Sequence, residues 1–147
     1  MDLHPDLMDV LGAFSSSNVD YLVVGGWAVS VHSEPRFTKD LDLLIGSAPD
    51  NLERAASALH LFGAPDSIVA HARALGPDEF LFFGVPPARI DLLRSIPGVS
   101  FDEAFGRRLD VQWGATTVHI ISKVDLIAAK RAAGREKDLR DLRALER

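Results

Sequence analysis

The sequence has 147 residues, of which 47% are apolar and 25% charged, and it contains no cysteine. A chain of this length is the size of one domain, and the lack of cysteine excludes a disulfide framework, a thiolate nucleophile and a sulfur-ligated zinc site. The net charge of −5 argues against a broad basic surface that would bind a long nucleic-acid duplex. We therefore expect one domain over residues 1–147.

Charge and hydropathy also limit where the protein acts. Apolar runs stay well short of the roughly 20 residues that span a bilayer, and the first ten residues lack the basic-then-apolar pattern of a secretory signal. We expect a soluble, cytoplasmic protein without a membrane partner. Residues 130–147 hold seven Lys or Arg and four acidic residues, a net charge of +3 that leaves −8 on the rest of the chain.

The first half of the chain alternates helix and strand signals. Apolar residues at helical spacing predict a helix over residues 3–14, and the apolar run 21–24 predicts a buried strand that ends at Gly25-Gly26. A short helix should follow over residues 27–32, since Pro35 biases the residue before it away from helical geometry. Residues 39–45 read as the next strand, and Asp50 is a plausible N-cap for a helix ending near residue 61.

The second half of the sequence predicts four more strands, the last two in a hairpin, and two final helices. One or two helical turns are expected around residues 68–75, followed by two strands at 80–83 and 89–93 joined by a turn. Residues 111–113 and 117–121 suggest a late hairpin. Ser122 and Asp125 form a capping-box pattern before a helix, and a last helix follows Gly134, so the C-terminal helices occupy about 122–147.

Three aspartates fall within these predicted strands. Side chains alternate along a strand, so Asp40 and Asp42 should point the same way with their α-carbons about 6.6 Å apart. Adjacent carboxylates raise each other's pKa unless a cation lies between them. Asp91, flanked by Ile90 and Leu92, is costly to desolvate unless it is paired or metal-bound. Oxygen ligands of this kind suit magnesium or manganese.

Each of these signals also has a plainer interpretation. An Asp-x-Asp pair often belongs to a solvated strand face, and Gly25-Gly26 could be an ordinary tight turn. Their order strengthens the functional interpretation: a strand, two glycines, a short helix, the aspartate pair, and a later isolated strand aspartate. In that setting Gly25 and Gly26 would let backbone amides approach phosphate oxygens at a helix N-terminus.

The segment Gly25-Gly26-Trp27-Ala28, followed by Arg36-Phe37-Thr38-Lys39-Asp40-Leu41-Asp42-Leu43, resembles the nucleotidyltransferase superfamily of polymerase beta. The closer likeness is to its small bacterial AbiEii-type (MNT-like) branch, which also has a later strand aspartate and a C-terminal Lys…Lys-Asp-x-x-Asp pattern. Here Lys130 and Lys137-Asp138-Leu139-Arg140-Asp141 supply that pattern. The resemblance extends over residues 20–142.

The resemblance implies an α/β (α+β) nucleotidyltransferase fold with a mixed central sheet and helices packed on it. It also implies transfer of a nucleoside monophosphate from a nucleoside triphosphate such as ATP to a hydroxyl acceptor. Asp40, Asp42 and Asp91 would be the catalytic carboxylates and ligands of Mg²⁺ or Mn²⁺. The expected nucleotide- and phosphate-binding residues are Gly25, Gly26, Arg36, Thr38, Lys130 and Lys137.

Several assignments stay open at this level. Lys39 can be an exposed loop residue, and Asp138 and Asp141 can pair locally with Arg135 or Arg140. The acceptor can be a transfer RNA end, a protein or a small molecule. The first hypothesis is an active nucleotidyltransferase, and a toxin with an antitoxin partner is one form of it. The alternatives are a catalytically inactive nucleotide-binding module that acts through a protein partner, and an antibiotic nucleotidyltransferase.

Overall fold

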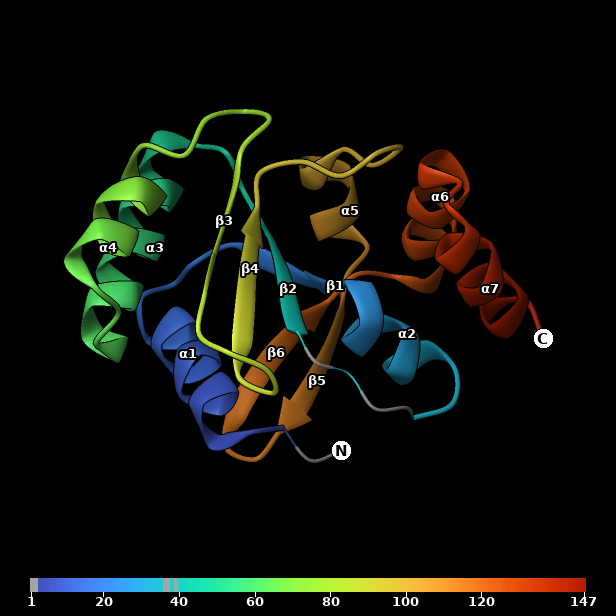
Figure 1. Ribbon diagram of the computed structural model, residues 1–147, viewed down its shortest axis with the longest axis horizontal. Coiled ribbons are helices and arrows are strands. Elements are labelled where there is room, and N and C mark those ends of the chain that lie inside the picture. Colours follow the sequence, from blue (N-terminus) through green and yellow to red (C-terminus); the bar gives the residue numbers. More distant parts are fainter. Residues whose placement is uncertain (1–2, 36–37, 39) are drawn as a thin grey trace.

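A mixed β-sheet forms the centre of the molecule in the computed structural model, which describes residues 3–35, 38 and 40–147 (Figure 1). Within those residues six strands run in the spatial order β3-β4-β2-β1-β6-β5. Neighbouring strands are antiparallel except for two parallel pairs, β2 with β4 and β1 with β6. The strands are β1 (Tyr21–Val24), β2 (Asp40–Ile45), β3 (Phe80–Phe83), β4 (Arg89–Leu93), β5 (Leu109–Trp113) and β6 (Thr116–Ile120).

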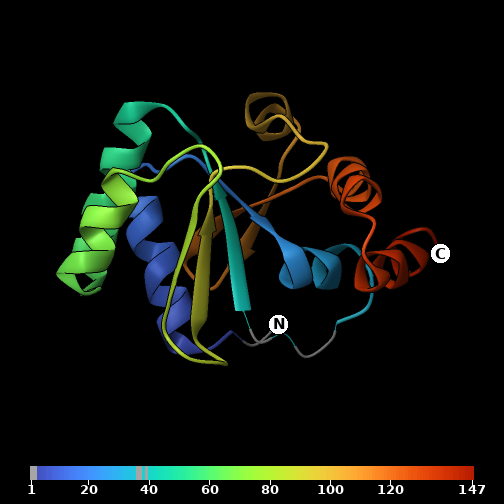
Figure 2. The same cartoon turned by 45° about the horizontal axis from the view of Figure 1, so that its top comes forward.

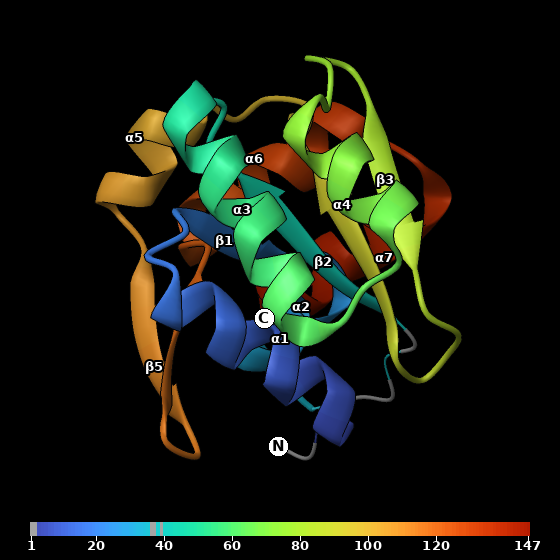
Figure 3. The same ribbon diagram turned by 90° about the vertical axis from the view of Figure 1, so that its left-hand side faces the viewer.

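Helices cover both faces of this sheet. Three of them, α1 (Pro5–Ser16), α3 (Pro49–Phe62) and α4 (Asp66–Arg73), lie together on one face (Figure 3). On the other face lie α2 (Gly25–His32), α6 (Lys123–Ala133) and α7 (Glu136–Leu145), grouped toward one side of the sheet (Figure 2). The short helix α5 (Phe101–Gly106) lies in the connection from β4 to β5. The predicted mixed sheet with helices packed on it is confirmed.

Alternation along β2 and β4 explains how the sheet separates core from site. Leu41 and Leu43 of β2, and Ile90 and Leu92 of β4, are fully buried on the face that carries α1 and α3. The residues between them point to the opposite face and are only partly buried. The apolar stripe of α1, formed by Leu7, Val10, Leu11 and Phe14, packs into the same core. The polar positions of these strands are thereby held on a rigid surface.

Most predicted elements are present, with three differences. Helix α3 begins at Pro49 and its N-cap is Ala48, so the prediction of Asp50 as the N-cap is wrong; proline at the first helical position fixes a suitable φ there. Helix α2 begins at Gly25, so both glycines belong to its first turn. Helix α5 had no sequence prediction. The Ser122 cap is confirmed, because its Oγ accepts a hydrogen bond from the backbone N–H of Asp125.

Across the described residues, the helices are too short or too polar to cross a membrane.

Candidate active site

The parallel pairing of β2 with β4 brings the predicted aspartates together. Asp42 lies directly opposite Asp91 in the ladder, and Asp40 lies opposite Arg89. Paired residues on neighbouring strands point to the same face of a sheet, so the four side chains share one surface. This surface faces the side of the sheet that carries α2, α6 and α7. Three carboxylates from two strands thus lie at neighbouring positions of one rigid sheet.

Gly25 lies against the carboxylate of Asp42. Its φ of +65° is in the left-handed region, and a Cβ added there would overlap Oδ2 of Asp42. Helix α2 starts at this residue, and its N-cap, Val24, makes no side-chain capping bond. The first backbone N–H groups of a helix have no partner within the helix, and the positive end of the helix dipole favours an anion. Gly25 therefore brings a helix N-terminus close to Asp42.

The carboxyl group of Asp42 is strongly perturbed. Burial raises its pKa to about 7, together with the charge of Asp91, a hydrogen bond with Asp91 and the charge of Asp40. The positive charge of Lys137 works in the opposite direction and lowers this pKa. The charge of Asp40 raises the pKa of Asp42, in the direction expected from the sequence, but Asp91 contributes more than Asp40 does. A proton or another cation between Asp42 and Asp91 relieves that repulsion.

The aspartates differ in their other partners. Asp91 accepts a hydrogen bond from Nε of Arg89 at 2.9 Å, whereas Oδ1 of Asp40 is buried and has no hydrogen-bond partner among the described residues. An unpaired buried carboxylate oxygen is costly and is the kind of atom that a divalent cation ligates. In the part of the chain that the structure describes, however, no three His, Asp or Glu side chains are gathered closely enough to hold a metal ion. Asp40 and Asp42 thus suit a cation chemically, while Asp91 is bound to Arg89.

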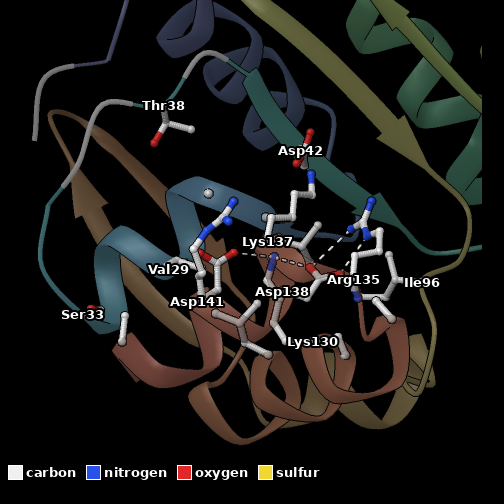
Figure 4. A pocket seen from close by; sticks show the side chains of 18 of the residues that line it. Val29, Ser33, Thr38, Asp42, Ile96, Lys130, Arg135, Lys137, Asp138 and Asp141 are labelled. Carbon is white, nitrogen blue, oxygen red and sulfur yellow. Dashed lines mark hydrogen bonds and ion pairs between the residues drawn. The ribbon is translucent and has the colours of Figure 1, made fainter. Parts of the chain in front are cut away.

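A cleft of about 1050 Å³ opens in front of β2 and is walled by α2, α6 and α7 (Figure 4). Seven of the predicted site residues line it, namely Gly25, Gly26, Thr38, Asp40, Asp42, Lys130 and Lys137. Asp91 lies next to Asp42 in the neighbouring strand rather than in the cleft wall, and Arg36 lies outside the described residues. The cleft volume is close to the upper end of the range for sites that bind small molecules.

The two predicted lysines have different surroundings (Figure 4). Lys130 is buried between two acids of α7, with its Nζ 3.3 Å from Oδ1 of Asp138 and 3.0 Å from Oδ2 of Asp141. Lys137 is exposed on α7, and its side chain extends across the cleft toward Asp42. The ammonium of Lys130 therefore joins α6 to α7, whereas that of Lys137 is directed at the carboxylates.

Local pairing of the α7 acids, one of the alternatives open from the sequence, is confirmed for Asp138. Nε of Arg135 lies 2.7 Å from its Oδ2, and the backbone N–H of Arg135 donates to the same oxygen. Burial raises the pKa of Asp138, but the hydrogen bonds from Arg135 and Lys130 outweigh it and hold this pKa below its usual range. The start of α7 is therefore fixed by ion pairs, which sets the position of Lys137.

Sequence reasoning missed Arg89, whose position two residues before Asp91 on the same strand was the available signal. It considered Arg135 and Arg140 only as local partners of the α7 acids and gave no role to Arg147, although all three line the cleft. The family described as "Nucleotidyltransferase of unknown function (DUF6036)" matches residues 6–146. The chain belongs to this nucleotidyltransferase family. No curated protein is significantly similar to it.

The first prediction concerns Gly25. Gly25→Ala should lower the free energy of unfolding by at least about 1 to 2 kcal/mol, because a Cβ is strained at positive φ and displaces Asp42. Gly12→Ala is the control: Gly12 is inside α1 and its added Cβ meets only Thr116 Oγ1 at 3.9 Å, so helix propensity should leave it neutral or more stable. Chemical denaturation of both variants measures this. Equal effects would contradict the close approach of Gly25 to Asp42.

The second prediction concerns pH. The pKa of Asp42 is about 7 in the folded protein, above its value in the unfolded chain, so between about pH 4 and 7 the folded state binds more protons. Protonation of Asp42 therefore stabilises the folded state fully below about pH 4. This stabilisation is lost as the pH rises to about 7, and the free energy of unfolding does not change further above that pH because of Asp42. Asp42→Asn should remove this part of the pH dependence when unfolding is measured at pH 5 and pH 8 without divalent metal. Parallel pH profiles for both proteins would refute the assignment.

The third prediction separates the two lysines. Lys130→Met leaves two buried carboxylates without their shared cation and should cost about 3 to 5 kcal/mol of stability. Lys137→Met removes an exposed charge and should change stability by less than about 0.5 kcal/mol, while weakening triphosphate binding. Denaturation and calorimetric titration together test both statements. A strongly destabilised Lys137→Met protein would show that this lysine is structural.

Proposed function

We propose that the protein transfers a nucleoside monophosphate from a nucleoside triphosphate to a hydroxyl acceptor, with Mg²⁺ or Mn²⁺ bound by Asp40, Asp42 and Asp91. The observation that carries this proposal is the pairing of Asp42 with Asp91 directly beside the α2 N-terminus, in a chain of the nucleotidyltransferase family. The order of these features along the chain also supports placing it in the AbiEii-type (MNT-like) branch, where a toxin with an antitoxin partner is one possible role.

The residues divide the work as their positions allow. The N–H groups at the start of α2, from Gly25 and Gly26, and the ammonium of Lys137 bind the triphosphate. The acceptor oxygen attacks the α-phosphorus, the bond from that phosphorus to the bridging oxygen breaks, and pyrophosphate leaves. Asp91 receives the proton of the acceptor hydroxyl. A divalent ion held by the carboxylates would stabilise the charge on the reacting phosphate.

An inactive nucleotide-binding module is the second candidate, and one observation favours it. The carboxylate of Asp91 is engaged by Arg89 at 2.9 Å, and the described carboxylates do not form a three-ligand cluster. In an active enzyme Asp91 must leave Arg89, or share itself between Arg89 and the metal, once the nucleotide complex binds. In an inactive module the ion pair would stay intact and nucleotide binding would occur without transfer.

The fourth prediction is the test of activity. The protein is incubated with magnesium and each nucleoside triphosphate, labelled at the α- or the γ-phosphate, with bulk RNA, lysate protein and aminoglycosides as acceptors. The α-label should be transferred and the γ-label should not, because the monophosphate moves and pyrophosphate leaves. Asp42→Asn should lose transfer by at least about 100-fold, since an electrostatic stabiliser of the reacting group is removed.

Asp50→Asn is the matched control, because Asp50 is an exposed aspartate in the first turn of α3 on the opposite face of the sheet. It should transfer label as the unmodified protein does. Nucleotide binding by calorimetry without any α-label transfer would establish the inactive module instead. Transfer that is unaffected by Asp42→Asn would place the chemistry elsewhere in the molecule.

A further inference from the structure

Two phenylalanines of the edge strand β3 lie on the same face of the sheet as the carboxylates. Phe82 is opposite Asp91 in the β3–β4 ladder, and Phe80 is opposite Leu93, which lines the cleft. The intervening residues, Leu81 and Phe83, point to the other face, where Phe83 contacts Phe62 of α3. Residues i and i+2 of a strand share a face, so this placement follows from the register.

Both rings are unusually open to solvent. Phe80 is 54% exposed and Phe82 is 51% exposed, although large aromatic side chains are normally among the most buried. Figure 1 shows the reason: α2, α6 and α7 are gathered over the β1 side of this face, away from β3 and β4. An aromatic surface of this kind, continuous with a polar site, is typical of a binding surface.

Arg89 connects this surface to the carboxylates. Its guanidinium lies 4.1 Å from the centre of the Phe82 ring and donates from Nε to Oδ1 of Asp91 at 2.9 Å. The planar cation is thus held between an aromatic ring and the aspartate that would accept the acceptor's proton. Flat guanidinium groups and phenylalanine rings are the side chains on which unpaired nucleobases stack.

The geometry of the proposed reaction, on which this inference rests, indicates which side the acceptor occupies. In an in-line displacement the attacking oxygen and the leaving pyrophosphate are on opposite sides of the phosphorus. The α2 N-terminus and Lys137 bind the triphosphate on the cleft side of Asp42. The acceptor therefore approaches from the other side, where Asp91 and the β3–β4 surface lie.

We propose that Phe80, Phe82 and Arg89 form the acceptor subsite, and that it takes the end of a single-stranded nucleic acid. One terminal base stacks on Phe80 and a second on the Arg89–Phe82 pair, which places the sugar hydroxyl near Asp91. A polycationic aminosugar fits less well, because it would bring positive charge against Arg89. A second copy packed on this face about a two-fold axis through Arg89 would bring the two guanidinium groups together.

The test measures binding without transfer. Fluorescently labelled single-stranded RNA and DNA oligonucleotides of about 10 nucleotides are titrated in magnesium, without triphosphate, and anisotropy gives Kd. Phe80→Ala and Phe80→Ala/Phe82→Ala should each weaken binding, by about tenfold or more per ring removed. The cation–π contact of Arg89 is with Phe82, so Phe80→Ala leaves the Arg89–Asp91 pair in place. A loss of binding in this single variant is therefore due to the missing ring.

Leu61→Ala is the control, since Leu61 is 69% exposed on α3, on the far side of the sheet. It should bind oligonucleotides as the unmodified protein does, and thermal melting should show all variants folded. Preference for RNA or for DNA identifies the sugar, and a blunt duplex should bind weakly because its bases are already stacked.

Three outcomes would overturn the proposal. Equal oligonucleotide affinity in all proteins would show that the rings do not bind bases. A dimer that dissociates in the double variant would assign the surface to a second copy, and label transferred to protein but not to nucleic acid would assign it to a polypeptide acceptor. The affinity for magnesium–triphosphate, measured by calorimetry, should be unchanged in the Phe80 variant. If the unmodified protein does not bind magnesium–triphosphate at all, that result contradicts the proposed function instead.

Discussion

Two carboxyl groups, those of Asp42 and Asp91, are held side by side by the parallel pairing of β2 with β4, and the site depends on how their repulsion is relieved. Because both strands are anchored by fully buried leucines and isoleucine on the opposite face, the α-carbons of Asp42 and Asp91 cannot move apart without disrupting the core. A proton shared between them is one solution: burial of Asp42, followed by the charge of Asp91, raises the pKa of Asp42 to about 7. A divalent cation would be the other, and Oδ1 of Asp40, which has no hydrogen-bond partner among the described residues, would offer it a further oxygen ligand.

The surroundings of this carboxyl pair are different on its two sides. On one side Gly25 brings the α2 N-terminus against Asp42, and Lys137 extends toward it from a helix fixed by the Lys130–Asp138–Asp141 ion pairs. On the other side Arg89 binds Asp91 and lies over the Phe82 ring. The two substrates of the proposed transfer need such different surroundings, because the triphosphate is strongly anionic whereas the acceptor carries a nucleophilic hydroxyl. This asymmetry links the fold to the proposed division between triphosphate and acceptor.

Local sequence patterns predicted the strands and the shared face of Asp40 and Asp42, because alternation is a property of one strand. They could not predict that Asp42 and Asp91 lie opposite each other, since register between strands about 50 residues apart depends on the whole sheet. Nor could they separate Lys130 from Lys137: the chain turns at Gly134, and the packing of α6 on α7 buries one and exposes the other. Asp50 failed as an N-cap because the helix starts at Pro49 and its N-cap is Ala48, two residues before Asp50. The aromatic surface was read as a plain apolar strand, because exposure is decided by which helices cover the sheet.

The most direct measurement of the central claim is the proton release when magnesium and a non-hydrolysable triphosphate bind together. Calorimetry at pH 7 in buffers of different ionisation enthalpy gives this number. A cation that replaces the proton between Asp42 and Asp91 should release about half a proton per protein, because a group with a pKa of about 7 is half protonated at that pH. Asp42→Asn should bind weakly and release none. Tight binding without proton release, equal in both proteins, would contradict the account of this carboxyl pair as the metal–nucleotide site.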